Sequence, residues 1–213
     1  MRKTLISALA LAGAIVLVGS ISALSGNTRV ERGKYMVTVI GCNDCHTPLK
    51  MGPKGPEPDM SRFLSGHPEQ MGVLPAVAPR GPWLWAGAAT NNAFSGPWGI
   101  SYAANLTPDQ NTGLGIWTED MFVKALRTGR HMGVSREILP PMPWQDFSHL
   151  NDKDAYAIAA YLKTIPAVSH KVPDIVPPGK KASTPTIPIP KPAPWDAPRP
   201  AGGNTPASGG TKA

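Results

Sequence analysis

Cysteine and aromatic residues are scarce in this sequence. Only two cysteines occur among 213 residues, and aromatic side chains make up 7% of the chain. Without a second cysteine pair, a zinc site made of four cysteines is excluded. Any other zinc site would need ligands from scattered histidines such as His67, His131 or His149. No alternation of strands and helices follows the cysteines, which argues against a thioredoxin-like dithiol protein.

The middle of the chain also lacks an excess of charge of either sign. The formal net charge is +7, but residues 29–170 are close to neutral because most of the excess lies at the two ends. Residues 171–213, for example, carry six basic and two acidic side chains. No basic face interleaved with aromatic residues lies in the middle of the chain, so we expect no nucleic-acid partner.

Only one long apolar run is present. It extends from about Leu5 to Leu24, and Arg2 and Lys3 precede it. Such a run is typical of an export signal or a membrane anchor. The basic residues before it favour an orientation that sends the following chain across the membrane. We therefore assign residues 1–25 to a signal peptide or N-terminal anchor. We expect a periplasmic location, with membrane association through residues 5–24.

Both cysteines lie in one pentapeptide, Cys42-Asn43-Asp44-Cys45-His46. On a helix, side chains three and four positions apart share a face. Two thiols on such a face can each form a thioether with a vinyl group of a porphyrin, while the adjacent imidazole binds the iron. The pattern predicts one covalent haem c, attached to Cys42 and Cys45, with His46 as the proximal ligand. A thiol redox site and a zinc site remain as alternatives.

Three segments have the capping residues and apolar spacing of α-helices. They cover about residues 29–42, 119–128 and 152–165. Thr118 precedes the second segment as an N-cap, and two acidic residues follow in its first turn. Small residues on the apolar stripe of the third helix would allow a close crossing with Gly33 in the first. These helices predict an all-α fold.

No apolar period persists between residues 47 and 104. Four Gly-Pro pairs mark turns in this stretch. We therefore expect an irregular, Pro/Gly-rich insertion between the first and middle helices. Its large aromatic residues should pack over a haem edge, over a partner surface or in a small satellite core; they are Trp83, Trp85, Phe94 and Trp98.

A methionine flanked by prolines lies between the second and third helices, in the segment Leu139-Pro140-Pro141-Met142-Pro143-Trp144. Prolines remove backbone donors and restrict φ, so this loop should be stiff. A stiff loop can hold a weak thioether ligand against iron, and Met142 is therefore the predicted distal ligand. Alternatives for this position are other methionines and one histidine: Met51, Met60, Met71, Met132 and His131.

Together these features resemble the class I cytochromes c, which have an early helix, a Cys-x-x-Cys-His motif, a middle helix, a methionine loop and a closing helix. The similar segments are residues 29–47 and about 104–166. The resemblance implies a class I cytochrome c fold over residues 26–170, with residues 47–104 as an insertion. Residues 171–213 are interpreted as a proline-rich disordered tail.

The resemblance also implies the roles of individual residues. The implied haem site consists of Cys42, Cys45, His46 and Met142, with Asn105 and Trp117 either near a propionate or in the core. The expected function is single-electron transfer by a non-catalytic carrier in the bacterial periplasm. Its donor would be a dehydrogenase or bc-type complex, and its acceptor an oxidase or reductase. Alternatives are a cytochrome subunit of a stable dehydrogenase or oxidase complex, and a haem enzyme or gas sensor with an open iron site.

Overall fold

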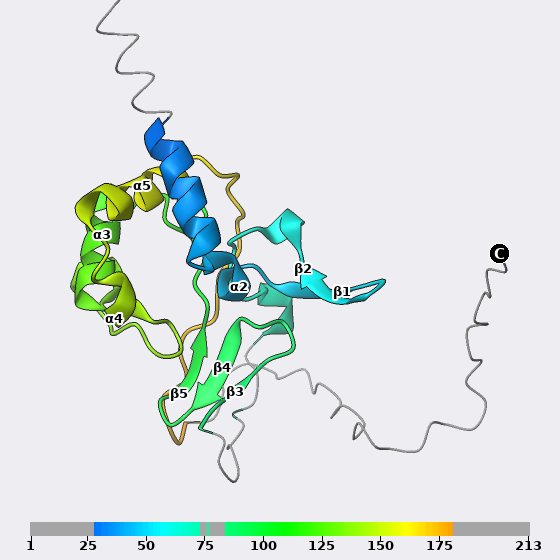
Figure 1. The fold of residues 1–213 in the computed structure, drawn as a ribbon. Helices are drawn as coiled ribbons and strands as arrows, with labels where there is room; N and C mark the ends of the chain where they lie inside the picture. The colour runs from blue at the N-terminus through cyan, green and yellow to red at the C-terminus, as the bar shows by residue number, and fades with distance from the viewer. Residues whose placement is uncertain (1–27, 73–75, 77–83, 181–213) are drawn as a thin grey trace, which may run out of the picture.

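The computed structural model describes residues 28–72, 76 and 84–180. In this part of the chain, the helices lie on one side of a three-stranded sheet, and a two-stranded hairpin projects laterally (Figure 1). The apolar run before residue 25 and the chain after residue 180 lie outside the described residues. No helix within the described ranges has the length and apolar character needed to cross a bilayer.

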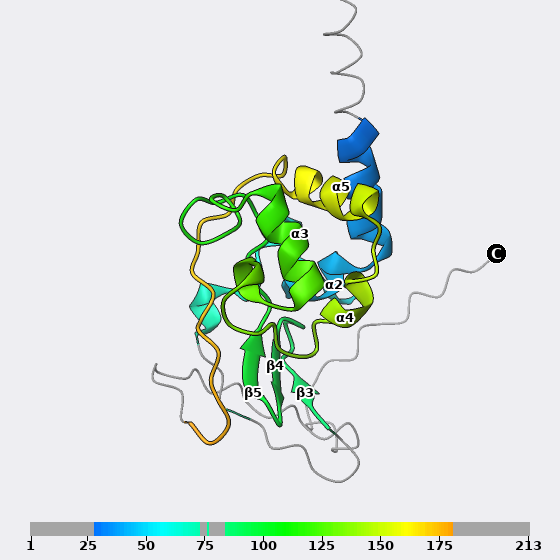
Figure 2. The same ribbon diagram turned by 90° about the vertical axis from the view of Figure 1, so that its left-hand side faces the viewer.

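The helices gather at one end of the molecule (Figure 2). Within the described chain, the first helix covers residues 28–39. It is followed along the described chain by α2 (Cys42–His46), α3 (Glu119–Thr128), α4 (Trp144–Phe147) and α5 (Asp152–Leu162). Short 3₁₀ helices cover Met60–Arg62, Glu69–Met71 and His131–Gly133.

Helices α3 and α5 form where the sequence predicts them. Thr118 caps α3 by accepting a hydrogen bond from the Met121 amide, and Gly129 ends the helix with a left-handed φ of 65°. Asn151 caps α5 by accepting a hydrogen bond from the Asp154 amide. Both predicted helices are confirmed, although α5 ends a few residues earlier than expected.

The first helix does not run into Cys42 as predicted. It ends at residue 39, and Gly41 then adopts a left-handed φ of 73° immediately before α2. Glycine favours this break because a residue with a Cβ rarely adopts that conformation. The Cys-x-x-Cys-His motif therefore lies on a short helix of its own.

The first helix and α5 cross closely at Gly33, as the small residues predict. A Cβ placed on Gly33 would lie 1.9 Å from the backbone carbonyl oxygen of Ala157. Next to this crossing, the Arg32 guanidinium donates two hydrogen bonds to the Asp154 carboxylate, at 2.8 and 3.1 Å. The two helices are thus joined by backbone contact and by a bidentate ion pair.

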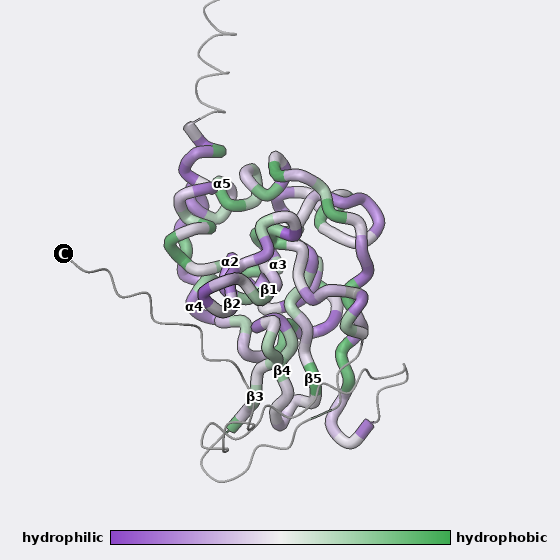
Figure 3. Tube along the Cα trace, turned by 90° about the vertical axis from the view of Figure 1, so that its right-hand side faces the viewer, coloured by the Kyte–Doolittle hydropathy of each residue, from purple (hydrophilic) through white to green (hydrophobic). Residues whose placement is uncertain are grey.

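Apolar side chains from the helices and their connecting loops form the main core. Its buried members are Met36, Val37, Leu64, Leu114, Ile158, Leu162 and Ile165. Partly buried residues packed against them are Ile40, Cys42, Phe63, Leu106, Trp117, Phe122, Leu150 and Tyr161. Figure 3 shows hydrophobic and hydrophilic residues interspersed along the helices, as expected of helices with one buried face.

The all-α prediction, with its class I cytochrome c fold, is wrong because the described chain contains two antiparallel sheets. Strands β1 (Leu49–Gly52) and β2 (Gly55–Pro58) form a hairpin. Strands β3 (Ala86–Gly87), β4 (Ala93–Gly96) and β5 (Gly99–Tyr102) form the second sheet in that order. Both sheets lie within the stretch that the sequence predicts to be irregular.

Two of the Gly-Pro pairs lie at hairpin turns. The β1–β2 turn contains Gly52-Pro53, and the β4–β5 turn contains Gly96-Pro97. The residues that start the second strands, Gly55 and Gly99, have φ values of 120° and 93°, which favour glycine. Each strand has two to four residues. Such strands are too short for an alternating pattern to be recognised, so the sequence shows the turns and not the strands.

Residues 171–180 belong to the tail predicted from the sequence, but they contact the three-stranded sheet. Val176 is buried and exchanges two backbone hydrogen bonds with Ile100 of β5, at 2.8 and 3.0 Å. A Cβ on Gly99 would lie 2.0 Å from the Val176 carbonyl oxygen, so this close approach depends on glycine. The packed part of the chain therefore extends beyond residue 170.

Candidate functional site

Helix α2 carries both cysteines of the chain. Cys42 and Cys45 are half-buried and are not joined in a disulfide. Burial raises the pKa of the Cys42 thiol to about 12, and it also raises the pKa of Cys45. A reactive dithiol has a lowered thiol pKa. The environment of these two cysteines therefore argues against the thiol-redox alternative.

His46 is oriented by a carbonyl group from a distant part of the chain. The imidazole is buried, and its Nδ1 lies 2.8 Å from the carbonyl oxygen of Ala104. Because that oxygen can only accept, Nδ1 carries the proton and the lone pair of Nε2 is directed elsewhere. Burial also lowers the pKa of His46, which favours the neutral, metal-binding form. His46 therefore meets the chemical requirements of an iron ligand.

Residues of the insertion contact the backbone of α2. The Gly66 amide donates to the His46 carbonyl at 2.7 Å, and the Asn91 side-chain amide donates to the Asp44 carbonyl at 2.8 Å. Sequence reasoning missed these contacts, like the Ala104 contact, because they join residues that are far apart in the sequence. In the sequence, the length of the insertion is the one feature that suggests contacts of this kind.

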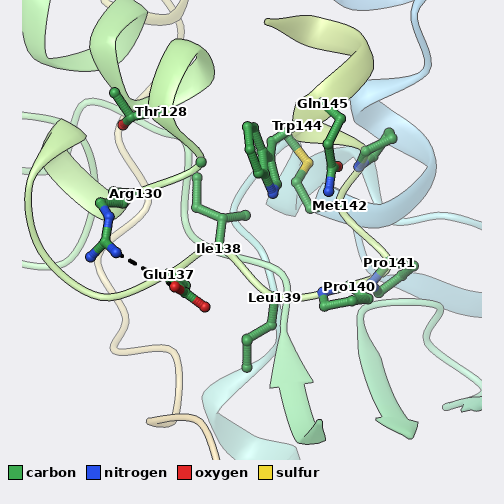
Figure 4. A pocket seen from close by; sticks show the side chains of 12 residues that line it. Thr128, Arg130, Glu137, Ile138, Leu139, Pro140, Pro141, Met142, Trp144 and Gln145 are labelled. Atoms are coloured by element: carbon green, nitrogen blue, oxygen red, sulfur yellow. Dashed lines mark hydrogen bonds and ion pairs between the residues drawn. The ribbon is translucent and has the colours of Figure 1, made fainter. Parts of the chain in front are cut away.

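Met142 lines a cavity of about 560 Å³, together with the end of α3 and the rest of the methionine loop (Figure 4). Its neighbours in the cavity wall include the apolar side chains of Ile138, Leu139 and Trp144. The volume lies in the range of cofactor and ligand sites, roughly 300–1,000 Å³. No residue of the Cys-x-x-Cys-His motif lines this cavity, which therefore forms only the methionine side of the candidate site.

The methionine loop is held at both of its ends and near its middle. The Ile138 amide donates to the Gly129 carbonyl at 2.8 Å. The Trp144 ring packs so closely on Gly129 that a Cβ there would lie 2.3 Å from it. The Ser101 hydroxyl donates to the Pro140 carbonyl at 2.6 Å. The loop is thus attached to α3 and to β5.

Asn105 uses its side chain within the loop that precedes α3. Its Nδ2 donates to the Val168 carbonyl at 2.8 Å and to Thr112 Oγ1 at 3.3 Å. Its Oδ1 accepts from the amide and the hydroxyl of Thr107, at 3.0 and 2.7 Å. These bonds give Asn105 a structural role in the loop, and its contact with a propionate stays a prediction.

Trp117 lies at the edge of the main core. Its ring is perpendicular to that of His131, with 4.8 Å between the ring centroids. The core packing expected of Trp117 is present. A place near a propionate stays a prediction for this residue too.

The other candidate ligands are in different environments. His67 is buried, and its two ring nitrogens lie 2.9 Å from Asn92 Oδ1 and 3.0 Å from the Gly72 carbonyl oxygen. Met51 and Met60 are exposed. Within the described ranges, no three His, Cys, Asp or Glu side chains gather as a metal-binding group. The zinc alternative therefore gains no ligand set from this part of the chain.

The aromatic residues of the insertion pack locally. Trp85 and Phe94 meet edge to face, with 5.6 Å between their centroids. The Trp98 indole N–H donates to Ser101 Oγ at 3.2 Å. Trp83 lies outside the described residues. Phe94 is buried, as a satellite core requires, whereas Trp85 is exposed. Trp98 contributes a polar contact that the sequence does not suggest.

Comparisons with known proteins place the chain in a broad class, although no family model matches it. It is 36% identical over 156 residues to a nicotinate dehydrogenase subunit of Pseudomonas putida, over 73% of this chain and 10% of the relative. It is 29% identical over 151 residues to the cytochrome c subunit of the quinone alcohol dehydrogenase of Gluconobacter oxydans. This match covers 68% of this chain and 24% of the relative. It is 30% identical over 142 residues to a diheme cytochrome c-type protein of Cereibacter sphaeroides. This match covers 65% of this chain and 36% of the relative.

This chain is similar to c-type cytochrome subunits. The relatives' names support the expected cytochrome c character and agree with a non-catalytic, electron-carrying chain. The matched region spans between 10% and 36% of these three relatives. Because one of them is named as a diheme protein, the single haem expected here stays a prediction.

Proposed function

We propose that this chain is the electron-transferring cytochrome subunit of a dehydrogenase complex and carries one covalent haem c. The observation that carries this proposal is the Cys-x-x-Cys-His motif on α2, in which the His46 imidazole is oriented through Nδ1 by the Ala104 carbonyl. The similarity to dehydrogenase cytochrome subunits supports membership of a stable complex over the freely diffusing carrier that the sequence predicts. A periplasmic location and an anchor at residues 5–24 belong to the same proposal.

Bound haem c would supply reversible exchange of one electron between ferric and ferrous iron. In this proposal Cys42 and Cys45 would form the thioether links, and His46 Nε2 and the Met142 thioether would bind the iron. On the methionine side the cavity wall combines apolar side chains such as Ile138 and Leu139 with polar ones such as Arg130. Because His46 and Met142 would both bind the iron, no position on it would remain open for a substrate. This is why we propose a carrier and not an enzyme.

The optical spectrum of the purified protein tests the ligand set, and Met142→Ala is the informative variant. We expect it to keep its covalent haem but to lose the methionine-to-iron charge-transfer band of the oxidised protein. Its reduced form should bind carbon monoxide, and its reduction potential should fall because a thioether favours ferrous iron. Potentiometric titration and spectra recorded with and without carbon monoxide measure these effects.

Met51→Ala is the matched control, because Met51 is 78% exposed on β1. Its spectrum should be that of the unmodified protein. Survival of the charge-transfer band in Met142→Ala would show that the distal assignment is wrong and would favour another methionine such as Met132. Rapid carbon monoxide binding to the unmodified reduced protein would favour the enzyme or gas-sensor alternative.

Purification under mild conditions distinguishes the complex from the free carrier. A dehydrogenase subunit should co-purify with a larger redox chain and should be reduced when that enzyme's substrate is added. A haem protein that is recovered alone, and is reduced only by added donors, would support the periplasmic shuttle. In either case the acceptor would be an oxidase, a reductase or another carrier.

A further inference from the structure

Strand β5 and the residues just after it contact both ligand-bearing segments. Ser101, within β5, donates its hydroxyl proton to the Pro140 carbonyl at 2.6 Å, two residues before Met142. Three residues after Ser101, the Ala104 carbonyl oxygen lies 2.8 Å from His46 Nδ1. One short stretch of backbone therefore touches the segments that carry the proposed distal and proximal ligands.

The Ser101 hydroxyl is itself held in one orientation. Ser101 is 6% exposed, and its Oγ accepts a hydrogen bond from the Trp98 indole at 3.2 Å. Its single proton can serve one acceptor, and the Pro140 oxygen is much nearer than the Phe94 oxygen at 3.5 Å. A hydroxyl that accepts one bond while donating another is strengthened as a donor. The contact with Pro140 is thus the end of a partly buried chain of hydrogen bonds.

The strand that carries Ser101 is well fixed. β5 pairs with β4 along its length, and Ser101 lies opposite Phe94. On its other side, Ile100 exchanges two backbone hydrogen bonds with Val176. A strand that is hydrogen-bonded on both sides moves little. Groups that are hydrogen-bonded to it are therefore held in place as well.

The methionine loop, by contrast, has few donors of its own. Pro140, Pro141 and Pro143 have no backbone N–H, so they cannot tie the loop through their own amides. The attachments at Gly129 hold its two ends, at Ile138 and Trp144. Between these ends, the Ser101 hydroxyl provides a polar attachment from another element.

We propose that Ser101 is a positioning residue for Met142. It acts through Pro140 and sets the place of the thioether relative to His46, whose imidazole is oriented from the same stretch of chain. This inference rests on the haem function proposed above. Ser101 does not contact the iron in the proposal, so its removal should alter how firmly Met142 is held and not whether haem is attached.

Ser101→Ala in the full-length, haem-loaded protein removes the donor with little change in volume. We expect the same haem content and the same reduced spectrum. The population in which methionine has left the iron should rise roughly fivefold, the factor that corresponds to one neutral hydrogen bond. Carbon monoxide should therefore bind the reduced protein roughly fivefold faster. The methionine-to-iron band of the oxidised protein should disappear at a lower pH.

Thr90→Val is the matched control. Thr90 is also a buried hydroxyl residue of the insertion, but it donates to Asn92 Oδ1 at 2.7 Å. This variant should leave the carbon monoxide rate and the pH of band loss unchanged. An unchanged rate in Ser101→Ala, or equal changes in both variants, would overturn the positioning role.

Trp98→Phe provides an independent test if Ser101→Ala does not accumulate. It removes the indole N–H that engages Ser101 Oγ and should accelerate carbon monoxide binding in the same direction, by a smaller factor. An unchanged rate in this variant would count against the hydrogen-bond chain. A missing methionine band in the unmodified protein would instead overturn the proposed ligand set, before any variant is compared.

Discussion

At the scale of single residues, the two candidate axial ligands depend on contacts made by neighbouring backbone carbonyls. The Ala104 oxygen orients the His46 imidazole, and the Pro140 oxygen links the Met142 loop to Ser101. Burial lowers the pKa of His46 and raises the pKa of Cys42, because it disfavours the charged form of each side chain. These shifts favour a neutral imidazole, which is the metal-binding form, and they argue against a reactive dithiol.

Burial of His67 predicts a pH dependence of stability. Burial lowers the pKa of His67 in the folded protein below its ordinary value of 6.5. At pH values between the folded and the unfolded pKa of His67, the unfolded chain binds more protons than the folded chain. The free energy of unfolding should therefore fall as the pH drops below about 6.5. His67→Gln should reduce this slope by up to about 1.4 kcal/mol per pH unit, the limit for one proton. Denaturant titrations between about pH 7.5 and about pH 5 measure the slope.

The control for this prediction is His149→Gln, because His149 is exposed on the surface. This variant should keep the pH slope of the unmodified protein. If His67→Gln and His149→Gln have the same slope, the buried imidazole is not a source of acid sensitivity. His131, whose pKa is also lowered by burial, would then be the next residue to replace.

At the scale of elements, the contact between the first helix and α5 depends on the absence of a side chain at Gly33. Gly33→Ala should lower the free energy of unfolding by about 1–3 kcal/mol, because its Cβ would overlap a backbone carbonyl that cannot rotate away. The loss should be seen even though alanine favours helix by about 1 kcal/mol over glycine. Chemical denaturation of the haem-loaded protein measures the difference.

Lys34→Ala tests whether this loss is specific to the crossing. Lys34 lies in the same helix and is exposed. Its replacement should change the free energy of unfolding by less than about 0.5 kcal/mol. Equal stability of Gly33→Ala and the unmodified protein would contradict the close approach of the two helices.

The elements also differ in how well the sequence predicts them. Helices α3 and α5 can be foreseen because their caps, Thr118 and Asn151, act over a few residues. The sheets escape prediction because their strands are short and their pairing joins residues across turns. The break before α2 escapes it as well, although Gly41 is a local signal for it.

At the scale of the whole molecule, the proposal predicts the mass of the mature protein. Material made in a bacterium that attaches haem c should have the mass of the polypeptide plus one haem, because only one Cys-x-x-Cys-His motif is present. Iron analysis should give one iron per chain. Cys42→Ala should leave at most one thioether link, which a shifted α band in the alkaline pyridine spectrum would reveal.

The bare polypeptide mass with two titratable thiols would contradict haem attachment. It would return the chain to the thiol-redox alternative, despite the raised pKa of Cys42. The control is Cys45→Ala, which should give the same loss of one link as Cys42→Ala. A variant that keeps both links would show that the replaced cysteine is not an attachment site.

The chemistry proposed for this protein rests largely on its sequence alone. The Cys-x-x-Cys-His pentapeptide, the proline-flanked methionine and the capped helices are short patterns, and each depends on residues within about one helical turn of one another. Tertiary structure decided that the described part of residues 47–104 contains two sheets and that β5 and the residues just after it contact both ligand-bearing segments. These features could not be foreseen, because hydrogen bonds such as Ser101 to Pro140 and His46 to Ala104 arise only when distant parts of the chain have packed together.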